Sequence, residues 1–148
     1  MRWNKVILKG LLYGLITGFL IGLFFKAIEE QGIANVYTLL LNVDFIPFIP
    51  HPLPQWQELL LHLIVSLIVG VGFSILMAWS RKPWIWGMGI SLITIPLFIP
   101  LTLLSERTPQ IDDTTALLWW IVGHLGYGVC LALLGLLFTP RHITRHFP

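Results

Sequence analysis

Four long apolar stretches, separated by shorter polar connections, set the pattern of the chain. They cover about residues 6–28, 57–79, 84–104 and 115–138. Each has the roughly 20 mostly apolar residues that a helix needs to cross a bilayer. The pattern predicts an all-α membrane protein with four transmembrane helices in one bundle, and a single domain over residues 1–148.

Composition supports lipid as the solvent of this chain. It has 148 residues, of which 56% are hydrophobic and 11% are charged, and its mean hydropathy is +0.83. A soluble domain carries about 25% charged residues, so a soluble fold would lack a polar surface. The expected partner is the lipid bilayer. The net charge of +2 is modest, and no nucleic-acid binding is predicted.

The charges predict how the helices are oriented. All seven acidic residues fall on one side of the four-span arrangement, and seven of the nine basic residues fall on the other: Arg2, Lys5, Lys9, Arg81, Lys82, Arg141 and Arg145. Basic residues mark the cytoplasmic side of a membrane protein. Both termini are therefore expected in the cytoplasm, with two loops on the outer side.

Prolines shape the outer loop and the third span. The loop at about residues 29–56 is apolar, but its prolines exclude a spanning helix: Pro47, Pro50, Pro52 and Pro54. A short helix over about residues 36–43 is expected on the outer membrane interface, followed by an extended proline-rich strap. Pro96 and Pro100 predict a break in the third span. Asp113, Thr114 or Thr115 is expected to cap the fourth.

The first span carries a glycine at every fourth position: Gly10, Gly14, Gly18 and Gly22. Each glycine costs a helix in water roughly 1 kcal/mol relative to alanine. Membrane helices associate by close van der Waals contact, which small residues permit. The spacing therefore predicts a helix-packing groove. It could hold another helix of this chain, a second copy or another membrane protein.

Polar residues at membrane depth indicate a candidate site, because such groups are costly in lipid. His62 and His124 follow Trp56 and Trp120, the expected outer interface markers, by six and four residues. Both histidines are thus expected roughly 6 to 9 Å below that interface. Glu58 and Ser66 lie one turn either side of His62. The predicted cluster in the outer leaflet comprises Lys26, Glu29, Glu58, His62, Ser66 and His124.

Several roles fit this cluster, and the sequence leaves them open. Histidine titrates near neutral pH, which favours a proton-responsive group. Glu58, His62 and His124 are candidate ligands for a transition metal, and the two histidines for a haem. The histidines could also only join helices by hydrogen bonds, as in a structural accessory subunit of a membrane complex. No catalytic motif is present, so an enzyme is not predicted and no cofactor is expected.

The chain resembles the YagU-like family of bacterial inner-membrane proteins in a series of short segments. These are, in order, "LITGFLIGLFFKAIEE", "LHLIVSLIVGVGFSIL", "WIWGMGI", "PLFIPLT" and "IVGHLGYG". The resemblance implies a multi-pass protein of the bacterial cytoplasmic membrane with a link to acid-stress resistance. It points to Lys26, Glu29, His62, Ser66 and His124. The family's larger outer segment is replaced here by the proline-rich strap.

Overall fold

The computed structural model describes residues 3–48 and 52–138, and these ranges contain helices but no strand. Four helical segments are long and apolar enough to cross a membrane: Trp3–Glu30 (α1), Gln55–Ser80 (α3), Pro83–Leu103 and Thr114–Phe138 (α6). The predicted all-α four-helix membrane bundle is confirmed. The ends of the helices lie within a few residues of the predicted ones.

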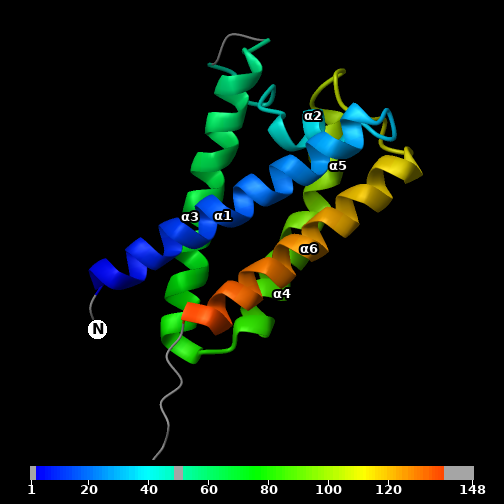
Figure 1. The fold of residues 1–148 in the computed structure, drawn as a ribbon. Coiled ribbons are helices and arrows are strands. Elements are labelled where there is room, and N and C mark those ends of the chain that lie inside the picture. The colour runs from blue at the N-terminus through cyan, green and yellow to red at the C-terminus, as the bar shows by residue number, and fades with distance from the viewer. Residues whose placement is uncertain (1–2, 49–51, 139–148) are drawn as a thin grey trace, which may run out of the picture.

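The start of α1, the end of α6 and the turn after α3 lie at one end of the bundle (Figure 1). The Lys9 ammonium donates a hydrogen bond to the Phe138 carbonyl at 2.7 Å, which joins the two terminal helices there. In the turn, Arg81 adopts a left-handed conformation with φ of 46°, and Pro83 opens the next helix. Arg2, Arg141 and Arg145 lie outside the described residues, and the cytoplasmic orientation stays a prediction.

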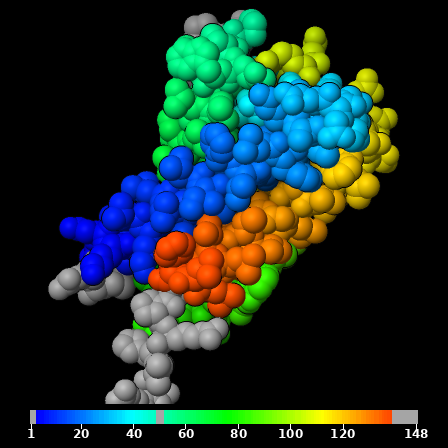
Figure 2. Space-filling model, in the orientation of Figure 1, coloured from blue at the N-terminus to red at the C-terminus, as the bar shows by residue number. Residues whose placement is uncertain are grey.

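The helices pack as two close pairs. The first pair is α1 with α3, and the second is α4 (Pro83–Thr94) with α6. The two pairs meet mainly where α1 lies beside α6, as the space-filling view shows (Figure 2). By contrast, α3 has few contacts with α4 and α6. The arrangement leaves α3 joined to the rest of the bundle chiefly through α1.

The glycine face of α1 lies against α3. A Cβ atom at Gly14 would be 2.3 Å from the Ser66 carbonyl oxygen, and one at Gly70 would be 2.3 Å from the Gly10 carbonyl oxygen. Gly18 meets the Ser66 side chain, whereas Gly22 has open space around it. Three of the four predicted packing glycines therefore contact a helix of the same chain. Gly22 is also buried, but an added Cβ there would meet no atom within 4 Å.

The third span is interrupted where its prolines predict a break. It consists of α4, a 3₁₀ turn at Ile95–Leu97 (η1) and the short α5 (Phe98–Leu103). Proline has no amide hydrogen to donate and disrupts the α-helical pattern. The Ile95 carbonyl accepts a hydrogen bond from the Trp120 indole nitrogen at 3.0 Å. The break therefore supplies a backbone acceptor that links this span to α6.

The outer loop contains the expected short helix, at Val36–Leu41 (α2). Its residues Val36 and Leu39 are fully buried, because the helix packs onto α1 and α3. Its position at the membrane interface stays a prediction. Pro50 of the predicted strap lies outside the described residues. At the other outer loop, the Asp113 carboxylate accepts the Ala116 amide at 2.9 Å, so Asp113 caps α6.

Candidate functional site

A cavity of about 310 Å³ lies where α3 is separated from α5 and α6. Its wall comes from α1, α2, the segment after α2, α3, the break in the third span, and α6. Most of the lining is aliphatic or aromatic. The lining side chains that carry a polar atom are Asn42, His62, Ser66, Thr94, Trp120, His124 and Tyr127.

The rim of this cavity reaches the surface of the helix bundle. Ile64, Val65 and Leu97 line the cavity and are also about half exposed, at 50%, 59% and 47%. They belong to the middle of membrane-spanning segments, where lipid is the surrounding solvent. The rim of the cavity is therefore exposed on the surface of segments that are long and apolar enough to cross a membrane.

Both predicted histidines line this cavity. The Nε2 atom of His62 lies 3.3 Å from the Gly18 carbonyl oxygen of α1. The Nδ1 atom of His124 lies 2.9 Å from the Trp120 carbonyl oxygen, one turn earlier in α6. The His124 ring packs against the Trp120 indole, with their centroids 4.1 Å apart. Each ring is thus held by a backbone carbonyl.

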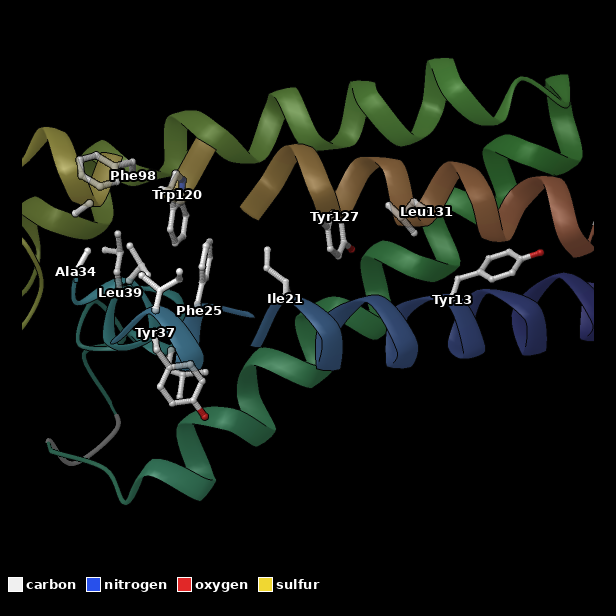
Figure 3. Close-up of a cluster of buried hydrophobic side chains, with 14 of the residues drawn as sticks. Tyr13, Ile21, Phe25, Ala34, Tyr37, Leu39, Phe98, Trp120, Tyr127 and Leu131 are labelled. Atoms are coloured by element: carbon white, nitrogen blue, oxygen red, sulfur yellow. The ribbon is translucent and has the colours of Figure 1, made fainter. Parts of the chain in front are cut away.

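Trp120 itself lies in the core and does not face the membrane. Its side chain is 2% exposed and stacks on Phe25 of α1 at a centroid distance of 5.6 Å. Figure 3 shows the two rings facing each other between α6 and α1, with Phe98 of α5 nearby. Trp120 was a wrong choice of interface marker, because an aromatic side chain close to the interface can also point into the bundle.

Three hydroxyl groups meet beside the histidines. Ser66 donates a hydrogen bond to the Gly14 carbonyl at 2.8 Å, across the glycine contact of α1 and α3. Thr17 donates to the Tyr13 carbonyl at 2.8 Å within α1. The Tyr127 hydroxyl interacts with both of these side chains, and Tyr127 points from α6 towards α1 (Figure 3). This cluster connects three helices at the cavity wall.

Glu58 does not join the histidines. Its side chain is buried, and its Oε1 atom accepts a hydrogen bond from Arg107 at 2.8 Å. The same guanidinium binds both carboxylate oxygens of Asp44, at 2.7 and 3.1 Å. These hydrogen bonds to Asp44 and Glu58 raise the pKa of Arg107 above its ordinary value. We call Arg107, Asp44 and Glu58 the arginine clamp.

The arginine clamp holds the cavity wall from outside. Asp44 lies within the segment after α2 whose residues Asn42, Val43 and Phe45 line the cavity. Ser105 also donates a hydrogen bond to Asp44, and the Asn42 amide donates to the Leu101 carbonyl of α5 at 3.0 Å. The clamp thereby fixes this segment to the start of α3 and to the loop before α6.

Lys26 and Glu29 also lie away from the histidines. The Glu29 carboxylate accepts hydrogen bonds from the Thr38 amide and hydroxyl, at 2.8 and 2.6 Å, and so fastens α2 to α1. Lys26 makes an exposed ion pair with Glu30 at 3.6 Å. The predicted cluster is therefore divided: His62, Ser66 and His124 share the cavity, and the charged members are paired elsewhere.

The metal alternative finds no geometric support. Among the described residues, no three His, Cys, Asp or Glu side chains form a group that could hold a metal ion. The Glu58 carboxylate is engaged by Arg107, and one nitrogen of each histidine faces a backbone carbonyl. The three candidate ligands thus point to three different partners.

Arg107 and Asn42 were not among the predicted site residues. Arg107 carried one signal in the sequence, because it is the only basic residue of the acidic second outer loop. Such a lone charge of opposite sign favours an ion pair. Asn42 and Tyr127 carried no comparable signal, since a polar residue at a helix end and an aromatic residue in a span are common in membrane proteins.

No known family model, characterised protein or solved structure matches this chain. The resemblance to the YagU-like family therefore stays a prediction.

Proposed function

We propose that this multi-pass membrane protein binds a small amphiphilic molecule from the bilayer in the cavity between α3, α5 and α6. The observation that supports this proposal is a cavity of about 310 Å³ with a mainly apolar lining and a half-exposed rim on helices long and apolar enough to cross a membrane. Binding pockets for small molecules are of about 300 to 1,000 Å³ and combine apolar walls with a few polar groups. No catalytic step belongs to the proposal.

A pair of variants on one helix tests this binding. Val65 lines the cavity, whereas Ile68 lies one turn further along α3, does not line the cavity and is 67% exposed. We expect Val65→Trp to fill the entrance and to lower labelling by a photoreactive single-chain lipid probe several-fold in the purified protein. Ile68→Trp should leave labelling unchanged. Equal labelling in both variants would contradict the proposal.

A proton-responsive role is the second candidate function, and it is favoured by two titratable side chains on one cavity. His62 and His124 both line it, and histidine changes charge near neutral pH. If protonation matters, His62→Gln and His124→Gln should each abolish a pH-dependent change in conformation or proton permeability. A wild-type response in both variants would exclude this role. The link to acid-stress resistance comes from the family resemblance and is tested by acid survival of cells that carry these variants.

The location proposed for this protein is the bacterial cytoplasmic membrane, with both termini in the cytoplasm. The distribution of basic and acidic residues supports this orientation. A reporter fused after Pro148 should read as cytoplasmic, and one inserted near Asp112 should read as external. The opposite pattern would reverse the orientation.

A further inference from the structure

The hydrogen bonds of the cavity lining restrict the chemistry of its ligand. We propose that the ligand is an uncharged single-chain lipid whose hydroxyl group donates a hydrogen bond to the histidines. This proposal rests on the proposed binding function. The direction of each hydrogen bond around the cavity carries this assignment.

The histidines present acceptors to the cavity. A neutral imidazole has one donor and one acceptor nitrogen, and a backbone carbonyl can only accept. The hydrogen must therefore lie on Nε2 of His62, which faces Gly18, and on Nδ1 of His124, which faces Trp120. The second nitrogens, His62 Nδ1 and His124 Nε2, are then acceptors. Neither has a partner among the described residues, and neither is sealed within protein atoms.

The hydroxyl groups of the wall also have their hydrogens engaged. Ser66 donates to the Gly14 carbonyl at 2.8 Å, and Thr94 donates to the Ser91 carbonyl at 2.8 Å. Thr17 likewise donates to a carbonyl within its own helix. Because Ser66 and Thr17 have no hydrogen left to donate, the Tyr127 hydroxyl is the donor in its contact with one of them, and its single hydrogen is then engaged too.

The remaining polar groups add little donor capacity. The Trp120 indole nitrogen donates to Ile95 at 3.0 Å. The Asn42 side chain donates to Leu101 at 3.0 Å and accepts from the Asp44 amide at 3.0 Å, which leaves one N–H of its amide group. The lining is therefore rich in acceptors and poor in donors. It complements a ligand that donates a hydrogen bond.

Charge and size narrow the ligand further. No carboxylate occurs among the described lining residues, and the nearby Glu58 is paired with Arg107. An ammonium group would therefore be buried without a counter-charge, which is strongly unfavourable. A volume of about 310 Å³ is at the lower end of small-molecule pockets and fits one alkyl chain. A neutral hydroxyl on a single chain satisfies both limits.

The test compares two isomers that differ in one hydrogen-bond donor. 1-Decanol and 1-methoxynonane have the same atoms, but only the alcohol can donate. Each competes with a photoreactive single-chain probe for the purified protein at pH 7.5, and concentrations are expressed as mole fractions in the detergent micelle. We expect the alcohol to compete at about 3- to 10-fold lower mole fraction than the ether, the range that one net hydrogen bond supplies. Decylamine should compete no better than the ether.

Variants assign the preference to the histidines. His124→Phe and His62→Phe each remove one acceptor, and we expect each to reduce the preference for the alcohol while the ether competes as before. Ser74→Ala is the matched control, since Ser74 is also buried and donates to a carbonyl, that of Val6, but does not line the cavity. It should keep the wild-type preference.

The outcomes separate this inference from the proposed function. If the alcohol and the ether compete equally in the wild-type protein, or decylamine competes best, the hydroxyl assignment is wrong although the cavity binds. If neither isomer displaces the probe, the proposed function itself is wrong. The wild-type comparison decides the matter even if a histidine variant fails to fold.

Discussion

Because α1 and α3 are in close contact, two alanine substitutions on one face of α1 should have opposite effects on the stability of the protein. In the first, Gly14→Ala, the new Cβ atom would lie 2.3 Å from the Ser66 carbonyl oxygen, whereas ordinary contact begins at 3.4 Å. The shortfall is about 1.1 Å, and backbone atoms cannot give way without moving a helix. In the second, Gly22→Ala, no atom lies within 4 Å of the added Cβ.

The magnitude follows from three opposing effects. Overpacking costs about 1 to 3 kcal/mol. A separation of about 1 Å would also stretch the Ser66–Gly14 hydrogen bond, now 2.8 Å, beyond the range of a hydrogen bond, which costs about 0.5 to 1.5 kcal/mol. Alanine regains about 1 kcal/mol of helix propensity. We therefore expect Gly14→Ala to destabilise by about 0.5 to 3.5 kcal/mol, and Gly22→Ala to stabilise by up to about 1 kcal/mol.

Reversible unfolding of the purified protein by SDS, followed by circular dichroism, measures this difference. Both variants insert the same side chain into the same helix, so the comparison cancels effects of alanine on the unfolded chain. Membrane insertion should be unaffected in both. If Gly14→Ala is as stable as Gly22→Ala, the contact of α1 with α3 is not as close as the structure shows.

Two further predictions concern the loop end of the bundle. Arg107→Ala should destabilise the protein by about 1 to 3 kcal/mol, because it leaves the buried Glu58 carboxylate unpaired. Adding Glu58→Gln should recover part of this loss in the same SDS titration. A double variant that recovers nothing would contradict the arginine clamp. Burial, with smaller effects of nearby glutamates, raises the pKa of Tyr37. The folded state therefore loses stability as pH rises above about 10. The tyrosinate absorbance of the wild-type protein, after subtraction of that of Tyr37→Phe, should appear only above that pH. Ionisation of Tyr37 at or below that pH would contradict this prediction.

The architecture was predictable where one physical property dominates. A run of about 20 apolar residues leaves the backbone no partner in lipid except itself, so the spans follow from hydropathy. Pro96 and Pro100 likewise fix the break in the third span, because proline lacks an amide hydrogen. The spacing of Gly10, Gly14 and Gly18 indicated a close contact. The identity of the neighbouring helix was not predictable, since small residues occur on other spans too.

The site was predictable only in part, because spacing along a helix defines a face and not its neighbours. His62 and His124, which spacing predicts at matched depths, both line one cavity. Glu58 is on the same face as His62, but a loop residue distant in sequence, Arg107, binds its carboxylate. Whether Glu58 pairs with a residue of its own helix or with a loop residue depends on where the loops fold. The burial of Trp120 shows the same limit.

The cavity follows from the uneven distribution of small residues among the helix contacts. Gly14 and Gly70 bring α1 against α3, and Gly87 and Gly128 bring α4 against α6. No such pair lies between α3 and the second helix pair within the described residues, and few contacts form there. Without close backbone approach, helices in lipid gain little by associating. The glycines that tighten two contacts thus leave the third loose, and the space between α3, α5 and α6 stays open.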